Sequence, residues 1–145
     1  MSEEQAKHLC YLSAHDLRIG NWVYDGEFTK FPMQVVVIGE DWVYLDFPCN
    51  EGDVWEECPK ELQPIPLTSE FFEKNGFVKE RFYCKVFYFK KINGMILKAY
   101  EHSIGWEIHM KHEESINAFS KGIDYVHELQ NAYYVSTGEE LEIEL

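Results

Sequence analysis

The sequence is short of basic residues and has no long apolar run. Only 13 Lys+Arg stand against 26 Asp+Glu in 145 residues, so the formal net charge is −13. A negative excess of this size disfavours a general affinity for nucleic acid or for anionic membranes. The longest aliphatic stretch, Val35–Ile38, is far shorter than the roughly 20 apolar residues that a membrane-spanning helix needs. We therefore expect no membrane contact and regard nucleic acid as an unfavoured partner.

Signals for export and for disulfide formation are missing as well. The N-terminus has no basic start followed by an apolar run, so we expect a cytoplasmic protein. The cysteines, none of them in a C-x-x-C pair, are expected to be free thiols in that compartment; they are Cys10, Cys49, Cys58 and Cys84. Cys84 alternates with apolar residues, which predicts its burial as a small hydrophobe. Cys49 and Cys58 flank an acidic loop, where a bridge or a metal site is the alternative.

Several catalytic signatures are also absent from the sequence. It contains no G-x-S-x-G nucleophile elbow and no H-E-x-x-H zinc motif. It contains neither of the glycine-rich loops, G-x-G-x-x-G and G-x-x-x-x-G-K-[ST], that cradle phosphates. We therefore expect no cofactor. We interpret the chain as a non-catalytic protein-interaction module that binds a protein partner or a second copy of itself.

The sequence does contain enough apolar material for a core. Hydrophobic residues make up 46% of the chain and aromatic residues 16%, which is too apolar for a disordered acidic chain. A chain of 145 residues buries roughly 68–70% of its unfolded surface, so it needs neither a metal nor a disulfide to fold. This length suits one compact domain or two small segments that share a core.

The first segment, residues 1–67, is predicted to form short strands separated by turns. Asp25-Gly26 is a tight-turn dipeptide, and prolines limit the last strand to an edge. Strands are predicted at 17–24, 33–38, 42–47, 54–55 and 62–67. This number of short strands predicts a small, curled antiparallel sheet. Because the first strand resembles that of SH3-like barrels, we expect an N-terminal SH3-like β-barrel.

The second segment, residues 68–145, mixes helices and strands. Asn93-Gly94 favours a hairpin turn. Asp124 is the expected N-cap of a last helix, and Gly138 is its expected end. The predicted elements are a helix at 68–76, a three-stranded β-meander at 82–91, 95–100 and 106–111, a helix at 125–137 and a short C-terminal strand at 141–145. The predicted fold class is therefore α+β.

Four motifs follow one another along the chain. They are LRIGNWV at 17–23, PIPLT at 64–68, VHELQN at 126–131 and TGEEL at 137–141. In their order and spacing they resemble a family of small uncharacterised bacterial and phage-associated proteins. The resemblance covers the ends and the junction of the chain but little of residues 77–122. The family brings no established activity, so the resemblance implies no catalytic residue.

Charge is distributed unevenly along the chain. Residues 1–66 carry a net charge of −9 and residues 67–145 a net charge of −4. Within Glu40–Glu61 there are eight acids and one base, whereas Lys74–Lys98 holds seven bases and one acid. An acidic segment of this kind offers a further alternative, in which it mimics a polyanion and occupies a nucleic-acid-binding partner.

The basic stretch contains a predicted strand with two different faces. One parity, from Phe82 to Tyr88, gives an apolar core face, whereas the other interleaves aromatic with basic residues. The second face could be buried with its lysines at the edges, or could stack against single-stranded nucleic acid or a peptide. The candidate binding residues on this face are Arg81, Tyr83, Lys85 and Phe87. Trp42 and Trp55 join them as aromatic interface anchors, and Trp55 stands in a charged loop.

A histidine-containing cluster supports a different class of function. Glu107 and His109 alternate along a predicted strand and are expected to share one face, with His112 close behind. Carboxylates and imidazoles are ligands of Zn²⁺ and Mn²⁺. The alternative function is therefore a small metal-assisted hydrolase that uses Glu107, His109 and His112, against the simpler interpretation of a solvated polar face.

Overall fold

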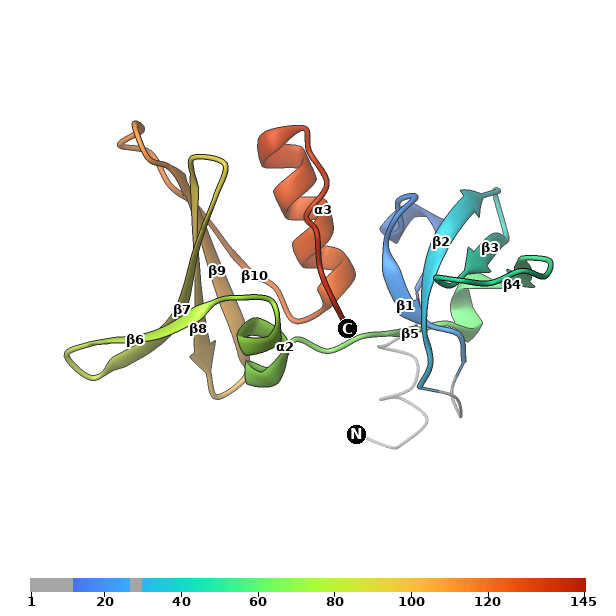
Figure 1. Ribbon diagram of the computed structural model, residues 1–145, viewed down its shortest axis with the longest axis horizontal. Helices are drawn as coiled ribbons and strands as arrows, with labels where there is room; N and C mark the ends of the chain where they lie inside the picture. Colours follow the sequence, from blue (N-terminus) through green and yellow to red (C-terminus); the bar gives the residue numbers. More distant parts are fainter. Residues whose placement is uncertain (1–11, 27–29) are drawn as a thin grey trace. The chain divides into compact units, whose positions relative to one another are not determined.

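The computed structural model describes residues 12–26 and 30–145 (Figure 1). The chain divides into two compact units, which we call unit 1 and unit 2. Unit 1 ends at Ile65 and unit 2 begins at Pro66. This boundary lies two residues before the one predicted from the sequence. Cys10 lies outside the described residues.

Unit 1 is built on a five-stranded antiparallel sheet. Its strands are β1 (Trp22–Tyr24), β2 (Pro32–Ile38), β3 (Val43–Asp46), β4 (Trp55–Glu57) and β5 (Gln63–Pro64), in the order β4-β3-β2-β1-β5. Two 3-10 helices, η1 (Ala14–Asp16) and η2 (Pro59–Glu61), precede β1 and β5 in the chain. Because side chains alternate between the faces of a strand, one face supplies the core. Val23, Val35 and Leu45 are fully buried there.

The expected SH3-like barrel is wrong. Each strand of unit 1 overlaps a predicted strand, but the sheet formed by the described residues stays open, with β4 and β5 at its edges. β5 has two residues, and Pro64 has no N–H to donate to a further strand. β4 has three residues and is largely exposed. Both edges are too short to pair with each other, so the sheet does not close.

Unit 2 contains a second five-stranded antiparallel sheet and two α-helices. Its strands are β6 (Val78–Phe82), β7 (Lys85–Ile92), β8 (Met95–His102), β9 (Gly105–His112) and β10 (Phe119–Gly122), in the order β10-β9-β8-β7-β6. The helices are α2 (Ser69–Lys74) and α3 (Val126–Thr137). Figure 1 shows both helices on the same side of this sheet.

The predicted three-stranded meander, the α+β class and the C-terminal strand are also wrong, because the structure is mostly β. A positive φ of 55° at Tyr83 turns the chain inside the predicted strand 82–91 and separates β6 from β7. β10 is exposed at every position and therefore has no alternating apolar pattern to reveal it. Residues 141–145 form no strand. Instead, the backbone N–H of Glu144 donates to Asn75 Oδ1 at 2.6 Å.

Two of the turn signals predicted in the second segment are confirmed. Asn93 and Gly94 both have positive φ and join β7 to β8, as predicted. Gly138, with a φ of 74°, ends α3 in the left-handed conformation. Asp124 is not the N-cap of α3, because Tyr125 occupies that position. Its carboxylate accepts a hydrogen bond from a backbone N–H near the start of β9 instead.

An aromatic cluster holds α2 against the sheet of unit 2. The ring of Phe72 lies 5.0 Å from Phe77, 5.7 Å from Tyr88 and 4.7 Å from Trp106, between ring centres. The Trp106 Nε1–H donates to the carbonyl of Leu67 at 3.0 Å, just before the helix. These contacts fix which face of the sheet is buried, and so which face is left to solvent.

Candidate functional site

The two faces of the unit 2 sheet are built from different residues. On β7, β8 and β9, the paired residues Tyr88, Ala99 and Ile108 are buried beneath the helices. Their neighbours in the chain point the other way. They are partly exposed, and Phe87 and Tyr100 are among them. We call this second surface the open face.

Three rings lie in contact across the open face. The ring centre of Tyr100, on β8, lies 5.2 Å from that of Phe87 on β7 and 4.9 Å from that of His109 on β9. The Nζ of Lys98 lies 5.3 Å from the centre of the Phe87 ring. We call Phe87, Tyr100 and His109 the aromatic row. An antiparallel sheet that faces water usually presents polar residues there, so these rings are unusual for a solvated face.

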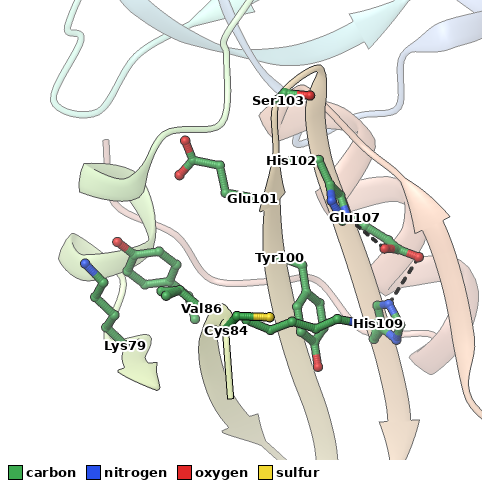
Figure 2. A pocket seen from close by; sticks show the side chains of 11 residues that line it. Lys79, Cys84, Val86, Tyr100, Glu101, His102, Ser103, Glu107 and His109 are labelled. Atoms are coloured by element: carbon green, nitrogen blue, oxygen red, sulfur yellow. Dashed lines mark hydrogen bonds and ion pairs between the residues drawn. The ribbon is translucent and has the colours of Figure 1, made fainter. Parts of the chain in front are cut away.

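A carboxylate lies beside the aromatic row, between two imidazoles (Figure 2). Glu107 Oε2 is 2.8 Å from His102 Nε2, and Glu107 Oε1 is 3.3 Å from His109 Nε2. The hydroxyl of Ser120, on β10, donates to Glu107 Oε1 at 3.0 Å. The hydrogen bond from His102, then that from Ser120, lowers the pKa of Glu107, and the charge of His109 acts in the same direction. The cluster therefore holds this carboxylate ionised.

The arrangement of these groups does not match a nucleophilic triad. In such a triad the carboxylate holds Nδ1 of the imidazole, which leaves Nε2 to take the hydroxyl proton. Here Ser120 Oγ is 3.4 Å from His109 Nε2, the nitrogen that also faces Glu107. The hydroxyl and the carboxylate therefore meet the same nitrogen of the imidazole, where a triad needs them at opposite nitrogens. The hydroxyl is also hydrogen-bonded to the carboxylate itself.

The candidate metal ligands are brought together only in part. Glu107 and His109 share the open face, as predicted from their alternation. His112, three residues beyond His109, falls on the opposite parity of β9 and therefore on the other face. Among residues 12–26 and 30–145, no group of three or more His, Cys, Asp or Glu residues is placed to hold a metal ion.

The pKa of Glu107 gives a direct test of this cluster. A carboxyl whose pKa is lowered in the folded state contributes stability above its unfolded pKa, and loses that contribution as pH falls through its folded pKa. Because the hydrogen bond from His102 is the largest cause of the shift, the His102→Leu variant, which has no side-chain donor, is expected to raise the pKa of Glu107 toward its ordinary value. Carboxyl NMR titration of the two proteins measures it. Identical titration midpoints would contradict the hydrogen bond.

The sheet divides into two hairpins beyond the aromatic row. Pairing of β7 with β8 stops at Phe87 and Tyr100. Pairing of β6 with β7 continues to Lys85, and pairing of β8 with β9 continues to His102. A cleft of about 750 Å³ lies at this division, with Lys79, Cys84 and Lys85 from one hairpin and Glu101, His102 and His109 from the other (Figure 2).

The structure separates the predicted binding residues of the basic stretch. Lys85 and Phe87 lie on the open face, whereas Arg81 pairs with Val86 on the opposite parity. Tyr83 is in the turn between β6 and β7 and is 85% exposed. The same turn explains why the predicted burial of Cys84 is wrong, since the alternation stops there and the thiol is exposed. Cys49 and Cys58 are also free thiols.

Trp42 and Trp55 lie on different faces of the unit 1 sheet. The ring of Trp42 contacts Tyr44, with 4.9 Å between ring centres. Trp55 is paired with Leu45, which follows Tyr44 in β3 and therefore lies on the opposite face. The side chain of Leu45 points into the core. Trp55 extends this core outward, because its ring centre lies 5.4 Å from that of Phe47, which packs against the core residues.

A group of three aromatic rings is formed at this edge of the core. The ring of Phe31 also contacts Phe47, with 5.4 Å between ring centres. Phe31 is 46% exposed and Trp55 is 45% exposed. We call Phe31, Phe47 and Trp55 the Trp55 patch. Phe31 and Phe47 were not among the predicted contact residues, because neither stands in a motif that distinguishes it from a core residue.

Carboxylates crowd the strand that carries Trp55. Glu57 lies two residues further along β4 and therefore on the same face as Trp55. Burial raises the pKa of Glu57, and the nearby carboxylates of Glu61 and Asp25 raise it further. Neighbouring carboxylates that raise the pKa of Glu57 mark a position where a cation would be favoured.

The residues of the four sequence motifs serve the fold. Asn21 is fully buried, and its Oδ1 accepts the Arg18 backbone N–H at 2.7 Å. His127 and Gln130 of α3 are buried as well. No family model, curated protein or solved structure was found to match the chain, so the family resemblance remains a prediction. No helix in the described part of the chain is long and apolar enough to cross a membrane.

Proposed function

We propose that the chain is a non-catalytic protein-interaction module in which the Trp55 patch binds a basic segment of a partner protein. The observation that carries the proposal is the side chain of Trp55. It is 45% exposed although it is held against Phe47, and it belongs to a strongly acidic segment. Exposed tryptophans that are fixed in place are typical anchors of protein interfaces.

The chemistry of the patch favours a cationic partner. A guanidinium placed over an indole ring gains about 0.5–1 kcal/mol at an exposed site. Glu57 lies on the same face, and a bound cation would relieve its repulsion with Glu61 and Asp25. Phe47 packs against the core, so the rings are already ordered and little conformational entropy is lost on binding. An arginine-rich segment suits this combination of a flat ring and carboxylates.

An enzymatic role has less support. The contacts of Ser120 and Glu107 to one nitrogen of His109 do not suit a relay. A metal-assisted hydrolase would need His112 beside Glu107 and His109, whereas strand alternation directs it to the other face. These two arguments favour binding over catalysis as the function of the chain.

Replacing Trp55 with alanine is expected to weaken binding of a fluorescent seven-residue arginine peptide about fivefold, equivalent to about 1 kcal/mol. The reason is the loss of the stacked ring, since the charge of the protein is unchanged. Fluorescence anisotropy at 150 mM salt measures it. Trp42→Ala is the matched control, because this ring packs on Tyr44 on the other face.

The control separates stacking from general charge attraction. A protein with a net charge of −13 attracts any arginine peptide to some extent. If Trp55→Ala and Trp42→Ala bind the peptide as tightly as the unaltered chain, charge alone explains the binding and the proposed patch is wrong. The proposal also expects the arginine peptide to bind more tightly than a lysine peptide of equal length.

A further inference from the structure

We propose that the open face of unit 2 binds single-stranded nucleic acid, with bases stacked on the aromatic row and phosphates held by the lysines beside it. The observations are independent of the Trp55 patch, which belongs to unit 1. The open face joins exposed rings, a local excess of lysine and a cleft at one end.

The rings provide the stacking surface. Phe87, Tyr100 and His109 cross three neighbouring strands, with 5.2 and 4.9 Å between successive ring centres. All three are partly exposed, so part of each ring is open to a ligand. On Phe87 a ligand would share the ring with Lys98, whose Nζ lies 5.3 Å from the ring centre. Base-on-ring stacking tolerates any base, because every base has a π-face. Successive rings on adjacent strands suit successive unpaired bases better than they suit a duplex, whose bases are already stacked.

The charge of the open face differs from that of the chain. Strand register places four lysines on it, namely Lys85, Lys91, Lys98 and Lys111, and Lys91 is engaged in an ion pair with Glu113. The same register places two acids there, Glu80 and Glu107, and Glu107 is already engaged by His102, His109 and Ser120. Of the thirteen acids in unit 2, seven lie in α2, α3 or the residues that follow α3. The negative total of the chain therefore does not describe this surface.

The cleft extends the row at the division between the hairpins. Its volume of about 750 Å³ lies within the range of small-molecule sites. Tyr100 and His109 belong both to the row and to the lining of the cleft. The lining also holds two lysines, Lys79 and Lys85, and two carboxylates, Glu101 and Glu107. A base that leaves the stack can enter the cleft while its phosphate remains near these lysines. Sequence-independent binding would thereby gain one position that senses the size of a base.

The first test is binding of a labelled twelve-residue thymidine oligonucleotide to the full chain at 50 mM salt, followed by fluorescence anisotropy. Tyr100→Ala is expected to weaken binding about tenfold, because it removes the central ring of the row. Phe119→Ala is the matched control. Phe119 is 41% exposed on the same sheet, but it pairs with Met110 and so points away from the open face. Thermal unfolding curves confirm that both variants are folded.

The second test concerns the phosphates. Lys98→Gln is expected to reduce the slope of log K against log salt concentration by about 0.7, the effect of one phosphate contact on a single strand. Lys121→Gln serves as its control, since Lys121 pairs with Ile108 on the other parity and is expected to leave the slope unchanged.

Three results would overturn the proposal. The first is the absence of oligonucleotide binding at 50 mM salt. The second is an equal loss of affinity in Tyr100→Ala and Phe119→Ala, which would show that the row is not the contact. The third is displacement of the oligonucleotide by a glutamate peptide of equal charge at the same concentration. That outcome would assign the surface to an acidic protein segment, because such a peptide has no bases to stack.

Discussion

Replacing Phe72 with alanine is expected to lower the free energy of unfolding by about 3–5 kcal/mol, the usual cost of removing a buried aromatic side chain. Phe72 is fully buried, and its ring contacts rings from the segment after α2, from β7 and from β9. The smaller side chain would leave a cavity between α2 and the sheet, which short elements cannot readily close. Since small domains have about 5–15 kcal/mol of stability in total, the variant should be close to unfolding at ambient temperature.

Urea denaturation followed by circular dichroism measures this loss. Phe82→Ala is the matched control, because Phe82 belongs to the same unit but is 66% exposed. The control is expected to change the free energy of unfolding by no more than about 0.5 kcal/mol. A loss below about 1 kcal/mol in Phe72→Ala would mean that the aromatic cluster does not hold α2 on the sheet.

In unit 1 the corresponding prediction concerns Leu45, and Leu45→Ala is expected to cost about 2–5 kcal/mol. Leu45 is fully buried at the centre of β3, opposite Val35 on β2 and Trp55 on β4. Its loss removes the core side chain that is paired with Trp55, and so part of the packing that supports the Trp55 patch. Peptide binding to the patch should therefore weaken together with stability.

Val37→Ala provides the control for this position. Val37 lies on the neighbouring strand β2 and is 42% exposed, so the substitution should be nearly neutral. Urea denaturation with tryptophan fluorescence measures both variants. If Leu45→Ala were as stable as Val37→Ala, the assignment of the β3 core face, and with it the orientation of Trp55, would be wrong.

Local turn chemistry carried much of the sequence prediction. Asn93, Gly94 and Gly138 were placed correctly because each supplies a positive φ that most residues avoid. Tyr83 was missed for the same reason, since an aromatic residue rarely adopts a φ of 55°. At this turn the chain reverses direction inside the predicted strand, and the residues before the turn lie on other faces than the alternation predicted.

The alternation of residues along single strands does not predict whether a sheet closes into a barrel. The strands of unit 1 were located from alternation, yet a barrel needs edges long enough to pair with each other. β5 ends after two residues at Pro64. The resemblance of the first strand to an SH3-like strand was therefore no guide to the edges.

The candidate sites could be predicted only where their members are close in sequence. The pair Glu107 and His109 was predicted because residues that are two apart on a strand lie on the same face of the sheet. Strand register brings Tyr100 and Ser120 to the same pair, although Tyr100 is seven residues from Glu107 in the sequence and Ser120 is eleven residues from His109. Register depends on the turns and on the core, so these neighbours follow from the fold.

The uneven charge noted in the sequence corresponds to two different surfaces. Glu57, with Glu61 and Asp25 near it, lies on the same face of β4 as Trp55, which suits a basic partner. The lysines of the second segment lie partly on the open face, beside the aromatic row. A net charge of −13 describes the chain as a whole, whereas each surface has a local charge of its own.

The most direct test of the proposed function uses the tryptophan indoles as reporters. The four indole N–H signals belong to Trp22, Trp42, Trp55 and Trp106. On titration of the ¹⁵N-labelled full chain with the arginine peptide, we expect the Trp55 signal to move the most. The Trp106 signal should stay in place, because its Nε1–H is bonded to the Leu67 carbonyl inside unit 2. A titration in which Trp55 does not move while the peptide binds would contradict the proposed interface.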